Sequence, residues 1–373
     1  MTHLRVLVLG GYGLFGGRLV ERLARLPGLQ IQVAGRSLVS ARAFVQQLQG
    51  RSSCRLEPCA LDTHAASFED SLRTLDPHVL VNASGPFQPS DYRVPGACIA
   101  AGIHYVDLAD NREFVTGIVR LHQEPVAGGV CAIAGASSVP ALSGAAADAL
   151  TQGLSVVHAI DIGISPANRT ERGLSTVRSI LAGCGKPLPA GAGAGAGGRA
   201  FAWSGTRAHT YPAAGGRRLL SPCDVPDLAL FPDRYAGHPS VCFGAGLELR
   251  LLHRGINLLA WMKRKRLVHD WSRHATLLKR LADLFSGAGS DAGAMHVRVE
   301  GLDHHAACVE RTWQLVATHG DGPFVPTLAA AAIIRKTQAG ALAPGAFPCV
   351  GLLALSEVTQ EMAGLAIRTE TTP

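Results

Sequence analysis

The glycines near the start of the sequence have the spacing of a phosphate-binding turn. Gly11, Gly13 and Gly16 form the pattern G-x-G-x-x-G within GGYGLFGG, residues 10–17. In such a turn the first glycine permits the tight bend, the second lets a pyrophosphate approach the backbone, and the third lets a helix pack close to the strand. The residues predicted to contact a dinucleotide here are Gly11, Tyr12, Gly13, Leu14, Phe15 and Gly16.

The surroundings of these glycines distinguish them from a chance match. Residues 4–9 form an aliphatic run typical of a strand buried on both faces of a parallel sheet, and residues 18–26 have the amphipathic pattern of a helix. The same glycine spacing recurs at Gly193, Gly195 and Gly198 within GAGAGAGG, where no strand precedes it and no helical pattern follows. We interpret this second match as a low-complexity loop without a phosphate-binding role.

The end of the second predicted strand, residues 30–34, carries a cation and a hydroxyl. Arg36 and Ser37 follow it, about 20 residues after the glycine turn, where an NAD enzyme usually carries Asp or Glu for the ribose hydroxyls. A guanidinium and a hydroxyl suit a 2′-phosphate, so the pattern predicts NADP(H) in preference to NAD(H). The alternative is that Arg36 is a surface residue on a turn.

Polar residues also end the third and fourth predicted strands, residues 55–61 and 79–82. Asp62 could reach the adenine amino group of a dinucleotide, or it could cap the following turn, and both alternatives stay open. Ligands of a doubly wound sheet lie beyond the carboxyl ends of its strands, so the residues after the fourth strand are predicted to line the cofactor crevice. These candidates are Asn82, Ser84 and Gly85.

A phenol and a carboxylate lie two residues apart in HYVDLAD, residues 104–110. On a strand, Tyr105 and Asp107 project to the same face, which makes them the candidate acid–base pair and the predicted catalytic residues. The alternative is a structural pair, in which a buried Asp satisfies the Tyr hydroxyl.

The helical patterns between these strands complete a repeating β-α-β order. They cover residues 40–49, 65–74 and 94–101. Strands that alternate with helices of this length indicate a parallel sheet. We therefore expect an N-terminal Rossmann domain, a doubly wound parallel sheet, over residues 1–130.

Length and composition indicate a globular protein of two domains. The chain has 373 residues, of which 47% are hydrophobic and 17% charged, with 43 glycines. A single hydrophobic core stops growing near about 250–300 residues, and this composition excludes disordered and fibrous classes. Nine cysteines without a C-x-x-C pair give neither a zinc ribbon nor a disulfide scaffold, which favours a reducing, cytoplasmic setting.

Neither a secretion signal nor a transmembrane segment is predicted. The N-terminus enters a strand directly, without the basic and apolar regions of a signal peptide. The longest apolar candidate, residues 339–355, contains Pro344 and Pro348 and reads as a turn leading into a buried strand.

The net charge of +7 does not indicate nucleic-acid binding. The basic residues are dispersed apart from residues 263–266, and the sequence lacks the interleaved aromatic residues of a surface that follows a phosphate backbone. An anionic cofactor or substrate explains the charge as well.

Two helical stretches, residues 247–262 and 267–285, allow two interpretations. The first stretch carries apolar side chains next to a basic end, so a surface that docks a membrane or a partner is conceivable. Packing in the core or in a homodimer is the preferred interpretation. The apolar residues are Leu247, Leu251, Leu252, Leu258, Leu259 and Trp261.

No metal site is predicted. Two antiparallel strands, residues 295–301 and 307–318, are joined through Asp303, His304 and His305. Adjacent histidines on a turn rarely converge on one ion, so a tight polar turn explains them better. Similarly, SSVP at residues 137–140 lacks the elbow of a serine nucleophile and reads as a loop that opens a helix over residues 141–150.

Five motifs in this order resemble the saccharopine dehydrogenase-like NAD(P)-binding oxidoreductase family. They are GGYGLFGG, VAGRS, NASGPF, ACIAAGIHYVDLAD and GASSVPALS. The resemblance covers residues 4–145 and is looser beyond, where GLSTVRSILAGCG and WQLVATHGDGPFVPTLAAAAIIRK are similar to the second domain of a bacterial branch.

The resemblance implies a second α+β domain on a mixed or antiparallel sheet over residues 131–325. It also implies a C-terminal segment, residues 326–373, that packs back toward the first domain. The strand predicted at 156–164 and the helix at 174–181 belong to the second domain.

The resemblance also implies hydride transfer between NADP(H) and a C=N bond, or less favourably a C=C or C=O bond, of a small or lipid-linked carboxylate. The arginine set that would grip saccharopine is not found, and Arg169 and Arg172 are the nearest candidates for substrate binding. The alternative function is a non-catalytic dinucleotide sensor or scaffold that docks a partner or a membrane surface.

Overall fold

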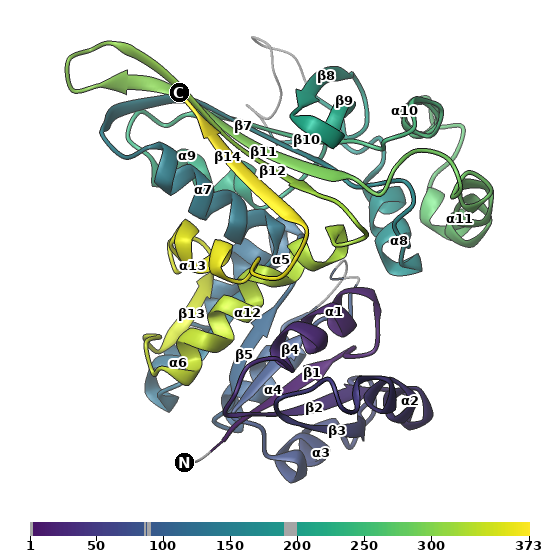
Figure 1. Cartoon of the computed structure of the whole chain (residues 1–373), viewed down its shortest axis with the longest axis vertical. Helices are drawn as coiled ribbons and strands as arrows, with labels where there is room; N and C mark the ends of the chain where they lie inside the picture. Colours follow the sequence, from purple (N-terminus) through teal and green to yellow (C-terminus); the bar gives the residue numbers. More distant parts are fainter. Residues whose placement is uncertain (1–2, 86, 88–90, 190–199) are drawn as a thin grey trace. The chain divides into compact units, whose positions relative to one another are not determined.

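The computed structural model describes residues 3–85, 87, 91–189 and 200–373 (Figure 1). Gly193, Gly195 and Gly198 of the predicted low-complexity loop lie outside the described residues. The chain forms two compact units. Unit 1 contains Met1–Leu142, Pro326–Leu353 and Glu357–Glu361, and unit 2 contains Ser143–Val325, Ala354–Ser356 and Met362–Pro373. The domain boundaries expected at residues 130 and 325 stay predictions.

Unit 1 is built on a seven-stranded parallel sheet in the order β13-β6-β5-β4-β1-β2-β3. The reversal of strand order beside β1 is that of a doubly wound sheet, and the predicted Rossmann fold is confirmed. The strands are β1 (Leu4–Leu9), β2 (Leu29–Gly35), β3 (Arg55–Ala60), β4 (Val79–Asn82), β5 (His104–Asp107), β6 (Cys131–Ala134) and β13 (Gly345–Pro348).

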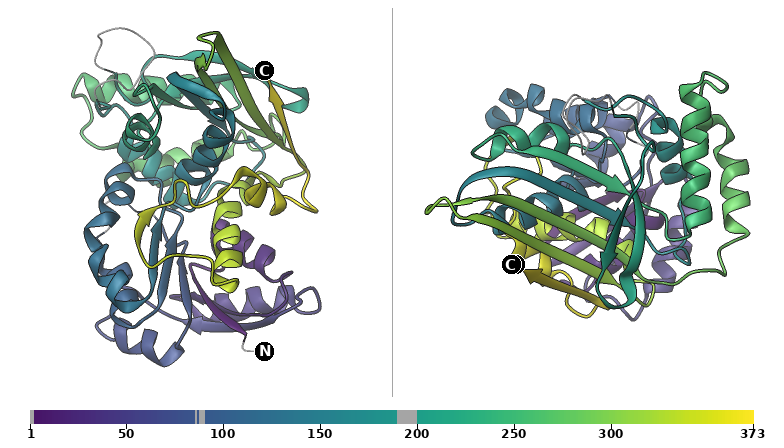
Figure 2. Two further views of the ribbon diagram at one scale, coloured as in Figure 1. Left: turned by 90° about the vertical axis from the view of Figure 1, so that its left-hand side faces the viewer. Right: turned by 90° about the horizontal axis from the view of Figure 1, so that it is seen from above.

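The central strands of this sheet are apolar on both faces because helices cover both. Val6, Leu7 and Val8 of β1 are fully buried. Figure 2 (left) shows α1 and α12 on one face of the sheet and the blue helices on the other. The helices of unit 1 are α1 (Leu14–Leu23), α2 (Leu38–Leu48), α3 (Phe68–Leu75), α4 (Arg93–Ala100), α5 (Arg112–Gly117), α6 (Gln123–Gly128), α12 (Val325–Gln338) and α13 (Leu355–Gln360).

Unit 2 is built on a second seven-stranded sheet in the order β14-β12-β11-β7-β10-β9-β8. Only the pair β7 and β10 is parallel among its described strand pairs, so the predicted mixed sheet is confirmed. The strands are β7 (Leu154–Ser165), β8 (Arg207–Tyr211), β9 (Gly216–Pro222), β10 (Ser240–Ala245), β11 (Gly293–Asp303), β12 (Cys308–Ala317) and β14 (Ile367–Thr372).

The core of unit 2 lies on the paired strands β7 and β11. Ile160 and Ile162 are opposite Val299 and Val297, and all four side chains are buried. The remaining helices are α7 (Ser143–Leu150), α8 (Leu174–Gly183), α9 (Asp227–Arg234), α10 (Arg250–Arg264) and α11 (Ala275–Asp283). No helix among the described residues is long and apolar enough to cross a membrane.

Two predicted helices differ from the observed ones for local reasons. Helix α1 begins at Leu14 and not at residue 18, because Gly13 is its N-cap and the glycines of its first turns lack the side chains that the amphipathic pattern needs. The stretch predicted at 267–285 is divided, since the side chain of Asp270 accepts a hydrogen bond from the Ser272 N–H and opens a separate 3-10 turn, Trp271–His274.

The C-terminal part of the chain contributes an edge strand to each sheet. Strand β13 pairs with β6 in unit 1, and β14 pairs with β12 in unit 2. Between them lies Glu361, a fully buried carboxylate that forms ion pairs with Arg22 of α1 at 3.1 Å and Arg335 of α12 at 2.8 Å. This buried triad fixes the C-terminal segment against two helices of unit 1.

The Glu361→Ala substitution is expected to lower the free energy of unfolding by about 3–5 kcal/mol, because it removes the carboxylate that compensates a buried cation. Urea denaturation monitored by circular dichroism measures this change. Glu69→Ala is the control, since Glu69 is 53% exposed and its ion pair with Arg73 is 3.8 Å long, and it should cost at most about 1 kcal/mol. Equal effects of the two substitutions would contradict a structural role for the triad.

Candidate dinucleotide site

The glycine turn after β1 is packed too closely for side chains. A Cβ added to Gly16 would lie 2.1 Å from the Gly10 carbonyl oxygen, and one added to Gly11 would lie 2.7 Å from the Val8 carbonyl oxygen. Gly10 has a φ of +76°, and its N–H and that of Gly11 both donate to the Ala34 carbonyl of β2. The turn is therefore held by backbone contacts that only glycines allow.

Helix α1 begins directly after this turn, so its N-terminus lies at the glycines. Gly13 caps the helix without a side-chain hydrogen bond, and the first turn contains no acidic residue. The first N–H groups of a helix have no intrahelical acceptor, and the helix dipole adds positive potential there. Leu14, Phe15 and Gly16 thus present backbone donors suited to a pyrophosphate.

Tyr12 links the glycine turn to the end of β2. Its hydroxyl accepts a hydrogen bond from the Ser37 N–H at 2.9 Å. Its ring lies against Gly35, where an added Cβ would come within 2.5 Å of the ring. Tyr12 therefore fixes the position of the Arg36–Ser37 segment relative to the turn.

The segment after β2 presents a cation beside a helix N-terminus. Arg36 is exposed, and within the described part of the chain its guanidinium has no acceptor. Ser37 caps α2 by accepting from the Ser40 N–H at 3.2 Å, and the first turn of α2 has no acidic residue. Ser40, whose hydroxyl lies 3.0 Å from that of Ser37, belongs to this group although the sequence analysis did not name it.

Asp62, after β3, takes part in a turn. Its Oδ1 accepts a hydrogen bond from the His64 N–H at 3.0 Å, and its backbone carbonyl accepts from the Ala65 N–H at 3.2 Å. The turn is thus present, and the side chain is also exposed at the carboxyl edge of the sheet. Its contact with adenine stays a prediction.

Hydrogen bonds connect the ends of β4 and β5. The Asn82 Oδ1 accepts from the Ser84 hydroxyl at 2.6 Å and from the Ser84 N–H at 3.1 Å, while the Asn82 Nδ2 donates to the Tyr105 hydroxyl at 3.4 Å. Ser84 is exposed, Gly85 is half-buried and Asn82 is buried. The Asn82 amide therefore joins the surface of the predicted crevice to the interior phenol.

Tyr105 and Asp107 are adjacent and both have no solvent exposure. Asp107 Oδ1 accepts from the N–H groups of Gly135 at 2.7 Å and Ala109 at 2.9 Å. Burial raises the pKa of Asp107 to about 6, against the opposite effect of these hydrogen bonds and of the Tyr105 hydroxyl. Gly135 is a partner that the sequence analysis missed, although it opens the motif GASSVPALS. The pair holds a carboxyl that titrates close to neutral pH.

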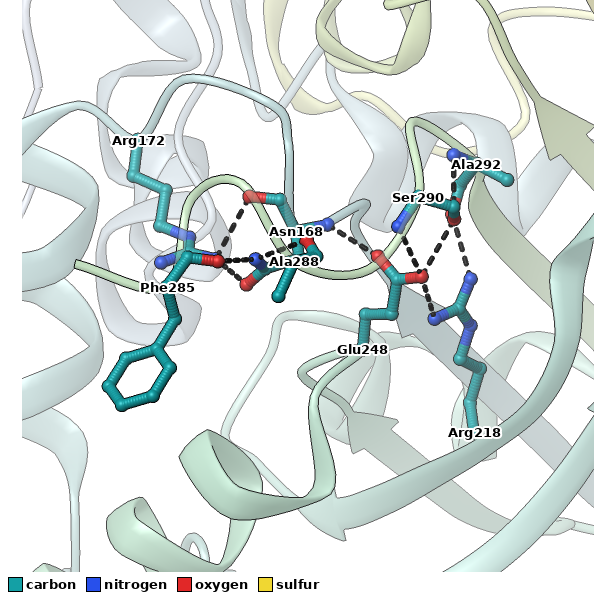
Figure 3. A network of polar contacts seen from close by, with 8 residues as sticks. All are labelled: Asn168, Arg172, Arg218, Glu248, Phe285, Ala288, Ser290 and Ala292. Atoms are coloured by element: carbon teal, nitrogen blue, oxygen red, sulfur yellow. Dashed lines mark hydrogen bonds and ion pairs between the residues drawn. The ribbon is translucent and has the colours of Figure 1, made fainter. Parts of the chain in front are cut away.

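The two arginines predicted to bind substrate differ in their surroundings. Arg169 is exposed, whereas Arg172 donates hydrogen bonds to the backbone carbonyl and side-chain oxygen of Asn168. Figure 3 shows that Asn168 and Arg172 belong to a polar network around Glu248. Arg172 is therefore already held by acceptors of unit 2.

Glu248 is the centre of that network. Its carboxylate accepts from the Asn168 N–H at 2.7 Å and the Ser290 hydroxyl at 2.7 Å, and it pairs with Arg218 at 2.9 Å (Figure 3). Burial favours a higher pKa for Glu248, but these hydrogen bonds and the ion pair outweigh it and hold the pKa below its ordinary value. The carboxylate is thus ionised and structural.

The comparisons with known proteins agree with this geometry. Residues 6–133 match the family model of the saccharopine dehydrogenase NADP binding domain. The N-terminal domain belongs to the saccharopine dehydrogenase-like NAD(P)-binding family. The predicted family is therefore confirmed, and the matched segment contains the glycine turn and both Tyr105 and Asp107.

A solved structure resembles the whole chain in fold, and a second covers it with a lower score. The apo saccharopine dehydrogenase (L-Glu forming) from Saccharomyces cerevisiae has a TM-score of 0.66 at 14% identity, over 99% of this chain and 100% of the other. The amine dehydrogenase from Mycobacterium smegmatis has a TM-score of 0.47 at 11% identity, over 94% and 96% of the two chains. No curated protein matches the sequence.

Beyond the NAD(P)-binding domain, unit 2 contains a polar cluster that the sequence analysis missed. The Arg207 guanidinium binds both oxygens of Asp161, at 2.6 and 2.8 Å, and the His296 Nε2 lies 3.5 Å from Asp161. The His209 and His296 rings stack at 3.8 Å, and burial followed by the nearby His296 lowers the pKa of His209 to about 4. The alternation of Arg207, His209 and Tyr211 along β8 was the available signal, but that strand was not predicted.

The turn between β11 and β12 is a tight polar one. Asp303 Oδ1 accepts from the N–H groups of His305 at 2.8 Å and Ala307 at 2.9 Å. Within the described residues, no group of three or more His, Cys, Asp or Glu side chains is placed to hold a metal ion. Asp303, His304 and His305 thus have the turn role that the sequence indicated.

Gly16→Ala is expected to weaken binding of both NADPH and NADH at least tenfold, because the new methyl group would meet the Gly10 carbonyl and displace α1 from the turn. Overpacking of this kind costs about 1–3 kcal/mol of stability. Nucleotide fluorescence titration and thermal denaturation measure the two effects.

Gly96→Ala in α4 is the matched control, since an added Cβ there meets nothing within 4 Å. It should keep nucleotide affinity and stabilise the domain by up to about 1 kcal/mol. Unchanged affinity in Gly16→Ala would exclude the glycine turn as the pyrophosphate site.

Proposed function

We propose that this protein is an NADP(H)-dependent oxidoreductase that transfers hydride to or from a C=N bond of a small or lipid-linked carboxylate. A C=C or C=O bond is the less favoured acceptor. The match of residues 6–133 to the saccharopine dehydrogenase NADP binding domain supports the class of enzyme. The observation that carries the proposal is the glycine turn, which is packed so closely against backbone atoms that only glycines fit at Gly11 and Gly16.

The residues present fit a bound dinucleotide. The N–H groups at the start of α1 would bind the pyrophosphate, and Arg36, Ser37 and the N-terminus of α2 would bind the 2′-phosphate. The segment from Asn82 to Gly85 would line the crevice at the ends of the strands. When bound, the cofactor supplies or accepts the hydride, and the protein positions it.

Preference for NADP(H) rests on Arg36. Its exposed guanidinium has no acceptor among the described residues, and no carboxylate occupies the first turn of α2 to repel a phosphate. A guanidinium binds phosphate through two parallel hydrogen bonds, which a ribose hydroxyl does not match.

Proton transfer is assigned to Tyr105 and Asp107. A carboxyl with a pKa of about 6 suits general acid–base catalysis near neutral pH. Their complete burial supports the alternative assignment, in which the pair positions Asn82 and Ser84 below the cofactor. Arg169, which is exposed, is the better of the two candidate arginines for a substrate carboxylate.

Arg36→Ala is expected to raise the Kd for NADPH roughly 10- to 100-fold and to leave the Kd for NADH nearly unchanged. Hydrogen bonds to a charged group contribute about 1.5–3 kcal/mol each, and NADH lacks the 2′-phosphate that receives them. Fluorescence titration of the purified protein with each nucleotide measures the difference.

Arg51→Ala is the charge-matched control, because Arg51 is an exposed residue in the turn after α2 and should leave both affinities as they are. If Arg36→Ala weakened both nucleotides equally, or neither, the assignment of the 2′-phosphate site would be wrong.

Asp107→Asn is expected to lower kcat/KM roughly 10²- to 10⁴-fold and to remove its rise with pH through about 6. The ionised carboxylate accepts the proton in substrate oxidation, so the wild-type rate should be low below pH 6 and level above it. A panel of imine, enone and carbonyl substrates with NADPH first identifies the reaction, and the pH profile is then measured in the direction of oxidation, with NADP⁺ and the reduced compound.

Tyr105→Phe provides the comparison within the pair, because it keeps the buried ring and removes only the hydroxyl. If Asp107 has a positioning role alone, Asp107→Asn should lower the melting temperature and leave the pH profile in place. That result would move the catalytic assignment away from the pair.

A further inference from the structure

One segment of unit 2 accounts for the net positive charge of the protein. Residues 250–285, which contain α10 and α11, carry nine basic and two acidic side chains, a net charge of +7. The whole chain has 35 basic and 28 acidic residues and the same net charge, so the other residues hold 26 of each. The basic side chains are Arg250, Arg254, Lys263, Arg264, Lys265, Arg266, Arg273, Lys279 and Arg280, and the acidic ones are Asp270 and Asp283.

The same segment carries most of the exposed apolar surface. Of eleven large hydrophobic side chains that are exposed in the described part of the chain, eight lie between residues 250 and 285. A concentration of this kind marks a binding surface, whereas isolated exposed apolar residues do not. They are Leu251, Leu258, Trp261, Leu267, Leu277, Leu281, Leu284 and Phe285.

Helix α10 turns two polar side chains toward the protein. His253 is fully buried, and its Nε2 lies 3.0 Å from the Ser221 hydroxyl. Asn257, one turn further, donates to the same hydroxyl at 2.9 Å and to the Trp203 carbonyl at 2.8 Å. A surface helix normally buries its apolar side. The inner side of α10 is instead held by hydrogen bonds.

The outer side of α10 carries large apolar side chains beside its cations. Leu251, Leu258 and Trp261 follow one another at helical spacing and are 65%, 55% and 49% exposed. The sequence analysis preferred packing in the core or in a homodimer for these residues; their exposure excludes the core for all three, and packing in a homodimer stays a prediction. Arg254 and Lys265 are exposed at the same helical spacing and place charge along this stripe.

Helix α11 repeats the arrangement. Its buried residue is Ala275, whereas Leu277, Leu281 and Leu284 are 58%, 50% and 78% exposed. Arg280 lies in the same turn and is exposed. Both helices thus combine outward leucines with outward cations.

Hydrogen bonds attach the segment with the two helices to the rest of unit 2. Both helices lie at the same end of the unit (Figure 2, right). The polar network of Figure 3 joins the two ends of the segment that contains α10 and α11, because Glu248 precedes α10 and Ser290 follows α11. In the same network, Asn168 Nδ2 donates to the Phe285 carbonyl at 2.6 Å. The Trp271 indole also donates to the Leu259 carbonyl at 2.9 Å.

Charge decides between possible occupants of this surface. A symmetric dimer through the two helices would bring a segment of net charge +7 against its own copy, which opposes association. A nucleic acid would neutralise the charge but would not bury leucines. An anionic lipid bilayer offers both an apolar layer and negative headgroups.

We propose that α10 and α11 bind the surface of an anionic lipid bilayer. The outward leucines and Trp261 enter the boundary between headgroups and acyl chains, and Lys265, Arg254 and Arg280 contact the headgroups. This binding is interfacial, since α10 has only 15 residues. It does not rest on the proposed oxidoreductase activity.

Vesicle cosedimentation of the full chain tests the proposal. We expect binding to phosphatidylcholine vesicles that contain about one third phosphatidylglycerol, weak binding to pure phosphatidylcholine, and weaker binding as salt is raised. Leu258→Ser with Leu281→Ser should reduce the affinity more than tenfold, and Lys265→Gln with Arg280→Gln should reduce it roughly fivefold per residue.

Two matched double variants in unit 1 serve as controls and should bind vesicles like the wild type. Val119→Ser with Val126→Ser removes two exposed apolar side chains, of 50% and 47% exposure, and Arg25→Gln with Arg51→Gln removes two exposed charges. Circular dichroism and thermal denaturation of every variant check that the fold is kept, independently of vesicle binding and of nucleotide binding.

Three results would overturn the proposal. The first is no binding of the wild type to anionic vesicles, and the second is equal binding by the helix variants and the controls. The third is a stable dimer in analytical ultracentrifugation that the Leu258 and Leu281 substitutions dissociate while vesicles are not bound, since the surface would then join two copies of the chain.

Discussion

The contact between Gly16 and the Gly10 carbonyl sets the distance between α1 and the end of β1. With no Cβ at either position, the helix starts directly on the strand, and its first N–H groups point beyond the sheet edge. The Ala34 carbonyl fixes the same turn from β2, and Tyr12 extends the link to Ser37. Arg36, the predicted cofactor residues at the end of β4 and the interior Tyr105 are positioned by strands that this turn holds in place.

Local signals in the sequence sufficed for most of unit 1. The strands at 4–9 and 79–82 have the predicted bounds, since short aliphatic runs between turns leave little freedom in where a buried strand ends. The start of α1 was missed because glycines carry no amphipathic signal. The candidate cofactor residues follow the strand ends of a doubly wound sheet, so the order of the elements alone predicts their neighbourhood.

What the sequence could not predict are contacts between distant residues. Glu361 and Arg22 are separated by more than three hundred positions, and neither residue type indicates its partner. Helix α10 is a sharper example. Its periodicity reveals an apolar stripe, but the direction of that stripe depends on Ser221 and Trp203, which accept the hydrogen bonds of the opposite side. Periodicity gives the faces of a helix and leaves open which face is inward.

The placement of β13 and β14 has a consequence for how this chain folds during synthesis. Each is the edge strand of a different sheet, and each comes from the last thirty residues of the sequence. Until these residues leave the ribosome, β6 and β12 present unpaired backbone edges, which are sites for pairing with other chains. Strand β13 is synthesised about twenty residues before β14, which takes a few seconds at most. The sheet of unit 1 can therefore be completed only that much earlier than the sheet of unit 2. The two units therefore mature almost together, although one begins at the N-terminus and the other 140 residues later.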